Sequence, residues 1–149
     1  MFLILLSLLV FSATQGQINK VQTVINLLKS DYQELDQAKS LIDAAVENSG
    51  TQKKAKTWYY RGQVYYNIYL SKDVNVKKLD PNPLKQSYQS FLTAKSLDKS
   101  KQYEKKLIFE INRNAINFFN KGSDEYDQKK YTQALESYET AMEIGKLPY

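Results

Sequence analysis

Three carboxylates lie close together toward the end of the chain, on Asp124, Glu125 and Asp127. Carboxylate oxygens at this density are the ligands that a hard cation such as Ca²⁺ prefers. The segment lacks the glycine and the distal glutamate of a calcium-binding loop. We therefore expect a solvated helix end at these residues, with no metal site and no cofactor.

The chain contains neither histidine nor cysteine. These two residue types supply the commonest general base, the commonest transition-metal ligand and the strongest nucleophile in proteins. The sequence also has no phosphate-binding glycine loop, nucleophile elbow or paired-acid motif. It therefore predicts a protein that is not an enzyme.

Apolar residues recur every three or four positions along most of the chain, which indicates amphipathic helices. Five glycines and three prolines among 149 residues also favour helix over a turn-rich β fold. Gly50 is available for a left-handed cap after the second helix, and Asn82 with Pro83 is a good start for the fourth. We expect six helices in three pairs, at about residues 18–29, 33–47, 56–66, 84–97, 101–126 and 131–144.

Two of these pairs share one template of rings, glycines and small residues. The earlier copy reads Trp58-x-x-Arg61-Gly62-x-x-Tyr65 and then Ser87-x-x-x-Phe91-x-x-Ala94, and the later copy reads Phe118-x-x-Lys121-Gly122 and then Ala134-x-x-x-Tyr138-x-x-Ala141. This pattern resembles the tetratricopeptide repeat (TPR), a hairpin of two helices. Gly122 and Ala141 are 19 residues apart, as in an uninterrupted repeat, whereas Gly62 and Ala94 are 32 apart, so the earlier copy carries an insert.

The resemblance covers about residues 33–145 and implies an all-α, right-handed TPR-like solenoid of about three hairpins. Residues 17–50 would form a degenerate hairpin, 52–98 a repeat interrupted by an insert at 71–83, and 101–145 a repeat with an extended first helix. In this respect the chain looks like the exported TPR proteins of Bacteroidota-type bacteria. The rings and small residues of the template are expected to pack in the core, because each hairpin buries its apolar face by stacking on the next.

In TPR arrays the first helix of each pair lines a concave groove that holds peptides or partner helices. By resemblance, the groove-facing positions are Lys56, Tyr59, Gln63, Tyr66, Asn67, Phe119, Ser123, Tyr126 and Asp127. An exposed row of rings beside amides would suit an extended peptide. The resemblance therefore implies a non-enzymatic scaffold or adaptor that binds a peptide or a partner protein and has no small-molecule substrate.

Basic residues are concentrated in the middle of the chain. Residues 52–106 carry thirteen basic and four acidic side chains, whereas the segments on either side are net acidic. This excess leaves open an alternative function, binding to an anionic surface such as an acidic protein, a lipid or a nucleic acid. A solvated lysine-rich surface is the simpler interpretation, and export would disfavour nucleic acid.

The first sixteen residues combine an apolar run, Phe2 to Phe11, with small residues up to Gly16. The run is shorter than the ~20 residues that cross a bilayer and is typical of a secretory signal peptide. No basic residue precedes it, so a buried core helix and an uncleaved membrane anchor stay open as alternatives. We expect residues 1–16 to direct export to the periplasm or the cell envelope.

Five residues follow Ile144 at the other end of the chain. Repeat arrays need a polar element that covers the last hairpin. We therefore expect the outer face of the last helix to be where a neighbour docks, such as further repeats beyond Tyr149.

Overall fold

The computed structural model describes residues 20–30 and 34–148, and all regular secondary structure in these residues is helical. A helical segment at residues 20–29 is followed by α2 (Leu35–Glu47), α3 (Ala55–Leu70), α4 (Val74–Lys77), α5 (Pro83–Leu97), α6 (Glu104–Asp127) and α7 (Tyr131–Gly145). The prediction of an all-α fold is confirmed. The predicted signal peptide, residues 1–16, lies outside the described residues.

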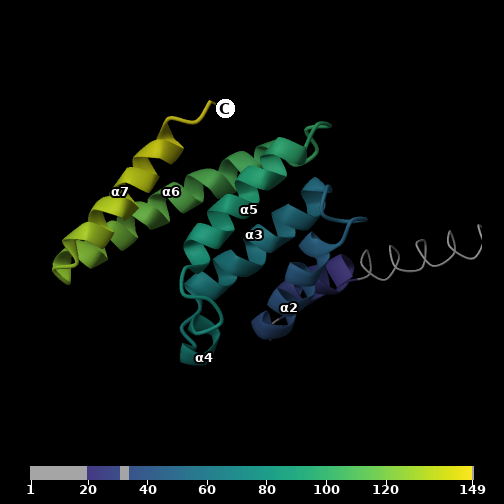
Figure 1. Ribbon diagram of the computed structural model, residues 1–149, viewed down its shortest axis with the longest axis horizontal. Helices are drawn as coiled ribbons and strands as arrows, with labels where there is room; N and C mark the ends of the chain where they lie inside the picture. Colours follow the sequence, from purple (N-terminus) through teal and green to yellow (C-terminus); the bar gives the residue numbers. More distant parts are fainter. Residues whose placement is uncertain (1–19, 31–33, 149) are drawn as a thin grey trace, which may run out of the picture.

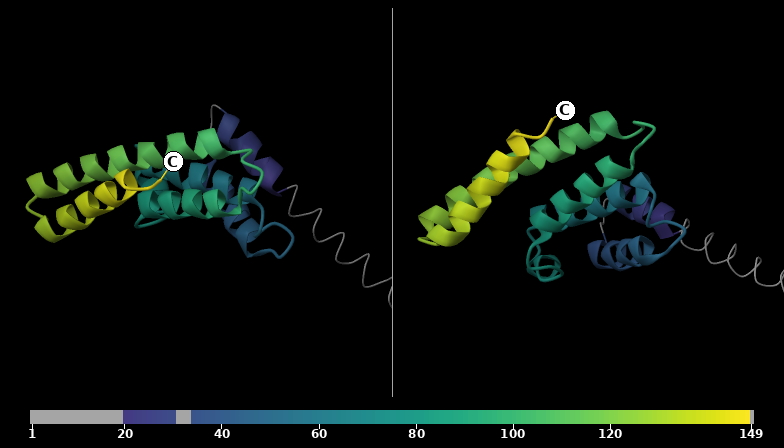
Figure 2. Two further views of the ribbon diagram at one scale, coloured as in Figure 1. Left: turned by 90° about the horizontal axis from the view of Figure 1, so that it is seen from above. Right: turned by 45° about the horizontal axis from the view of Figure 1, so that its top comes forward.

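The long helices form hairpins that follow one another in chain order. Helix α3 packs on α5, and α6 packs on α7. These two hairpins meet through α5 and α6, while α2 packs on the other side of α3. Figure 1 and Figure 2 show the result: α7 lies at the end of the molecule farthest from α2.

Two hydrophobic clusters hold the helices together. The first joins the segment at residues 20–29, α2 and α3 through side chains such as Val24, Ile42 and Val64, which are fully buried. The second joins α3, α5, α6 and α7 and includes the fully buried Phe91 and Ile144. Because α3 takes part in both clusters, it is the central helix of the fold.

In each of the two later hairpins, a glycine lets a ring of the second helix approach the first helix closely. A methyl group at Gly62 would lie 2.5 Å from the ring of Phe91, and one at Gly122 would lie 2.9 Å from the ring of Tyr138. The hydroxyl of Ser87 donates a hydrogen bond to the carbonyl of Gly62 at 3.0 Å. The hairpins α3/α5 and α6/α7 therefore share a contact between residues that the sequence template had already aligned.

The connections differ from the prediction in several places. Residues 71–83, predicted as a break, contain the short helix α4, whose cap Asp73 accepts a hydrogen bond from the Asn75 amide at 2.7 Å. With α4, the described residues hold seven helical segments instead of the six predicted. The left-handed cap at Gly50 is wrong, because no described glycine has a positive φ; the Gly50 amide instead donates to Asn48 Oδ1 at 2.9 Å. Asn82 does precede α5, but its side chain makes no capping bond.

Among residues 20–30 and 34–148, no helix has both the length and the apolar character needed to cross a membrane.

Candidate functional site

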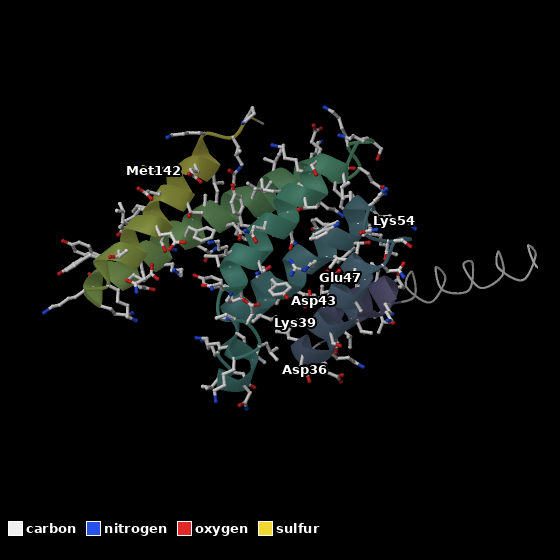
Figure 3. All side chains as sticks on the ribbon, viewed as in Figure 1. Asp36, Lys39, Asp43, Glu47, Lys54 and Met142 are labelled. Atoms are coloured by element: carbon white, nitrogen blue, oxygen red, sulfur yellow. The ribbon has the colours of Figure 1, made fainter. Side chains whose placement is uncertain are left out.

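An apolar groove lies between α6 and α7 at the end of the molecule. Its walls are formed by Ala115, Ile116, Phe119, Tyr138, Ala141 and Met142. The volume of this open groove is about 590 Å³. Ile116, Phe119 and Met142 are each more than half exposed, and Met142 lies on α7 at the side away from α2 (Figure 3). A contiguous exposed apolar surface of this kind is a candidate interaction site.

The matching positions are buried in the preceding hairpin. The pattern of α3 recurs in α6 60 residues later, so Phe119 corresponds to Tyr59 and Tyr126 corresponds to Tyr66. Phe119 and Tyr126 are 56% and 58% exposed, whereas Tyr59 and Tyr66 are 8% and 4% exposed. The hairpin α6/α7 therefore presents to solvent a surface that the hairpin α3/α5 buries.

Helix α6 covers that surface in the hairpin α3/α5. Leu107 and Ile111 of α6 belong to the same buried cluster as Tyr59 and Phe91. The ring of Tyr103, at the start of α6, has its centre 5.0 Å from that of Tyr59. A stripe of apolar residues spaced four apart along one helix thus fills the surface between α3 and α5.

Polar groups of α6 complete the same contact. The guanidinium of Arg113 lies 3.8 Å from the centre of the Tyr66 ring, and Asn117 Nδ2 donates a hydrogen bond to the Tyr66 hydroxyl at 2.9 Å. Glu110 is buried and forms an ion pair with Arg113. Burial and the nearby Glu110 carboxylate raise the pKa of Tyr59 to about 12. The cover therefore combines apolar side chains with one cation that stacks on a tyrosine ring.

The predicted binding positions on α3 are only partly at the surface. The expectation of exposure is wrong for Tyr59 and Tyr66, because α6 covers both rings. Lys56 is exposed, and Gln63 and Asn67 are half-buried. Gln63 Nε2 donates to the Tyr59 hydroxyl at 3.3 Å, and Asn67 Nδ2 donates to the Gln63 carbonyl at 2.9 Å. These amides are engaged within α3 itself.

The predicted positions on α6 lie at or beside the groove. Phe119 and Tyr126 are exposed, as expected, and Phe119 forms part of the groove wall. Ser123 is half-buried and its hydroxyl accepts a hydrogen bond from Tyr138 at 3.1 Å. Asp127 is exposed at the last residue of α6. The predicted row of exposed rings is therefore confined to α6.

Two residues of the groove wall were missed by the sequence interpretation. Ile116 and Met142 are 63% and 57% exposed, and neither belongs to the repeat template. Ile116 lies off the face of α6 that carries the buried Ile111 and Phe118. A large apolar residue outside the buried face of a surface helix indicates a second contact surface on that helix. The position of Ile116 in the sequence already carried this signal.

The rim of the groove is acidic on the α7 side. Helix α7 carries no lysine or arginine, and its Glu139 and Glu143 are exposed, whereas Glu136 pairs with Lys85 on the side facing α5. Glu139 lies within one helical turn of both Leu135 and Met142, so it borders the apolar wall. A cation at this edge would find no competing positive charge on α7.

An ion pair lies between α6 and α7 on the side facing α5. Lys121 Nζ donates to Glu125 at 2.5 Å and to the Ser137 hydroxyl at 3.0 Å. Ser137 in turn donates to the second Glu125 oxygen at 2.7 Å. Burial by itself raises the pKa of Glu125, but the hydrogen bonds from Lys121 and Ser137 outweigh it and hold that pKa below its usual range. All three residues line a polar cavity of about 170 Å³.

The acidic cluster singled out in the sequence is divided by this pairing. Glu125 is bound to Lys121 and Ser137, whereas Asp124 and Asp127 are exposed. Within the part of the chain that the structure describes, no group of three or more acidic side chains is placed to hold a metal ion.

Six of the thirteen basic residues of the middle segment lie at the two ends of α3. Lys53, Lys54 and Lys56 lie at its beginning, where Figure 3 labels Lys54. Lys72, Lys77 and Lys78 follow its end, in and around α4. A helix of 16 residues separates the two groups by about 24 Å. These two groups of lysines therefore do not form one continuous patch.

Comparisons of the chain with protein-family models, with curated proteins and with solved structures give no match.

Proposed function

We propose that the protein is a non-enzymatic adaptor that binds a partner polypeptide in the α6/α7 groove. One observation carries the proposal: Phe119 and Tyr126 are open to solvent, whereas the matching Tyr59 and Tyr66 are buried under a helix. Removing such apolar surface from water is favourable by about 25 cal/mol per Å². A polypeptide that covers the groove would gain this free energy.

The fold in this proposal is a right-handed, TPR-like solenoid. Its support is the glycine-to-ring contact that recurs at Gly62 and Gly122, together with the order in which the hairpins pack. Export to the periplasm or cell envelope is a further part of the proposal and is supported by the apolar run at Phe2 to Phe11. The absence of histidine and cysteine from the sequence supports a binding role over catalysis.

The binding surface in this proposal is the end of the array rather than a concave face lined by α3. Tyr59 and Tyr66 are already used to hold α6, so they have little area left for a partner. Phe119 has more than half of its surface free and lies beside the exposed Ile116 and Met142. These three side chains are the residues on which binding should depend.

A selection from a displayed library of random 16-residue peptides, with the full chain as target, tests the proposal. We expect selected peptides to lose binding to the Ile116→Glu variant and to retain it with Val74→Glu. The two wild-type side chains are 63% and 64% exposed and both changes add one negative charge, but Val74 lies in α4, away from the groove. Equal binding to both variants would overturn the proposal.

Salt dependence separates the proposal from the alternative of an anionic-surface binder. Contacts between apolar groups persist at a few hundred millimolar salt, whereas attraction between exposed charges is screened. We expect the selected peptides to remain bound at about 0.5 M NaCl. Loss of every selected peptide under this condition would favour the lysine-rich surface instead.

A further inference from the structure

We propose that the α6/α7 groove is specific for a basic amphipathic helix, an inference that rests on the proposed binding function. It adds the secondary structure and the charge of the partner to that function. The inference comes from the internal match between the hairpins α3/α5 and α6/α7.

The helical form follows from what occupies the matching surface. In the hairpin α3/α5, Tyr59, Phe91 and Ala94 are in one buried cluster with Leu107 and Ile111 of helix α6. In the hairpin α6/α7, the corresponding residues are Phe119, Tyr138 and Ala141, and they form the walls of the open groove. Because the two surfaces have the same construction, the interface between hairpins continues into the groove. The segment that continues it is a helix.

The spacing of the partner's apolar residues follows from α6. Tyr103, Leu107 and Ile111 are spaced four residues apart, and together they cover Tyr59 and its neighbours. Residues at this spacing lie on one face of a helix. The partner helix should therefore present a ring and two branched aliphatic residues at positions i, i+4 and i+8.

The first reason for positive charge is the tyrosine at the far end of the surface. Arg113 of α6 stacks on Tyr66, with 3.8 Å between its guanidinium carbon and the ring centre. The corresponding Tyr126 is 58% exposed and makes a ring contact with Tyr131 at 5.4 Å, which leaves most of its surface open. In the partner helix, a basic residue ten positions after the aromatic residue would stack on Tyr126 as Arg113 stacks on Tyr66.

The second reason is the charge of α7. Its Glu139 and Glu143 are exposed and have no basic residue beside them in the helix, whereas Glu136 is paired with Lys85 of α5. The chain contains a precedent for the match: α2 carries three acidic residues and one basic residue, and α3, which packs on it, carries two basic residues and no acidic one. Arg61 of α3 bonds Asp43 of α2 at 3.0 Å, and Figure 3 labels Asp43 with the other charged residues of α2.

A second copy of the same groove is a poorer occupant. Two copies facing each other through α6 and α7 would bring Glu139 and Glu143 of both copies together, and like charges repel across an interface. Each would also present an open groove to an open groove, with no ridge to fill it. A helix with a basic edge removes both problems.

The test measures the binding of two labelled synthetic peptides to the full chain by fluorescence anisotropy. The first has the sequence of residues 101–118, which carries four basic and two acidic side chains and includes the stripe that covers Tyr59. The second is the same peptide with Lys105→Glu, Lys106→Glu and Arg113→Glu. The protein variants are Ile116→Glu in the groove, Tyr126→Ala beside it, and Val74→Glu as the matched control.

We expect the basic peptide to bind and the acidic peptide to bind at least tenfold more weakly, about the effect of losing the cation–ring contact and gaining repulsion. Ile116→Glu and Tyr126→Ala should weaken the basic peptide, and Val74→Glu should leave it unchanged. Retained binding to Ile116→Glu would show that the peptide displaces internal α6, and this would overturn the inference.

The remaining outcomes separate this inference from the proposed function. Equal or tighter binding of the acidic peptide would overturn the requirement for a basic helix and leave a polypeptide-binding groove. If light scattering shows that the free protein is a dimer and that the Ile116→Glu variant is not, the occupant of the groove is a second copy of the chain. This result would also overturn the requirement for a basic helix and leave a polypeptide-binding groove. If neither synthetic peptide binds while the library peptides still depend on Ile116, the inference is overturned and the proposed binding function stands. If the library peptides fail as well, both proposals fall.

Discussion

At the scale of the residue, the contact between glycine and ring sets how close two helices of a hairpin come. At Gly62 the carbons of the Phe91 ring occupy the space where a side chain would begin. At Gly122 the ring of Tyr138 does the same, and the carbonyl of Ala134 lies 3.2 Å from the same point. A methyl group would overlap the ring at either position, and at Gly122 it would also crowd a backbone carbonyl, which moves less easily than a ring.

Substitution of these glycines by alanine should destabilise the protein. Alanine favours a helix by about 1 kcal/mol over glycine, but overpacking costs about 1–3 kcal/mol. We expect Gly62→Ala to lower the free energy of unfolding by up to about 2 kcal/mol, the difference between these two effects. Gly145→Ala is the matched control, because nothing lies within 4 Å of its new methyl group. Urea denaturation followed by circular dichroism measures both, and equal stability of the two variants would refute the close contact.

The carboxylate of Glu125 should make stability depend on pH in the acid range. Its pKa is lower in the folded chain than in the unfolded chain, so its contribution is present above the unfolded value, about 4.5, and is lost as pH falls through the folded value. The wild-type protein should therefore lose more free energy of unfolding between about pH 6 and pH 3 than the Glu125→Gln variant does. Glu139→Gln, at an exposed site on α7, should retain the wild-type slope. Parallel curves for wild type and Glu125→Gln would contradict the prediction.

At the scale of the element, one side chain connects three helices. Arg61 of α3 donates to Asp43 of α2 at 3.0 Å, and to Ser90 and Gln86 of α5 at 2.7 and 3.1 Å. Its guanidinium also lies 4.4 Å from the centre of the Tyr65 ring. The position of Arg61 matches that of Lys121, which bonds Ser137 as Arg61 bonds Ser90, so the bond from a cation to a serine recurs in the two hairpins.

Loss of this connection should cost more than loss of a surface ion pair. Arg61 is 14% exposed and makes charge-assisted hydrogen bonds, so Arg61→Met should lower the free energy of unfolding by about 2–3 kcal/mol. Lys85 and Glu136 form a pair between α5 and α7 that is 55% and 71% exposed, and Lys85→Met should change stability by less than about 0.5 kcal/mol. Thermal or urea unfolding of both variants measures the difference. A similar small effect at both sites would mean that the three-helix connection contributes little.

The sequence predicted the long helices and their pairing, because both depend on local patterns. The three- and four-residue periodicity located α5 and α7 closely, and the repeat template paired the helix of Gly122 with the helix of Tyr138, where the structure shows a close contact. Helix α4 was missed because four residues are too few for a periodic signal. The burial of Tyr59 and Tyr66 was missed for a different reason. It depends on how α6 crosses α3, which no pattern within α3 records.

In the molecule as a whole, the central helix α3 is covered on more sides than the end helix α7. Helix α3 packs against α2, α4 and α5, and its Tyr66 also reaches α6. Helix α7 packs mainly on α6, and its Leu135 and Met142 are more than half exposed. Each hairpin is stabilised by the neighbour that covers it. The end at α7 is the place where added contact would change stability most.

Hydrogen exchange should report this gradient directly. Regions with fewer buried contacts open at lower free energy, so the amides of α7 should exchange faster than those of α3 in the free protein. Addition of the peptide with the sequence of residues 101–118 should slow exchange in α7 and in the second half of α6, where the groove lies, and leave α2 unchanged. In Ile116→Glu the free protein should show the same gradient, because this side chain is 63% exposed, but the peptide should have no effect.

Uniform exchange across α3 and α7 would contradict the gradient. Protection by the peptide in α2 or α3 rather than α7 would show that it binds elsewhere. Slower exchange confined to α6 and α7 would locate the partner on the one apolar face that the described helices leave uncovered on this hairpin.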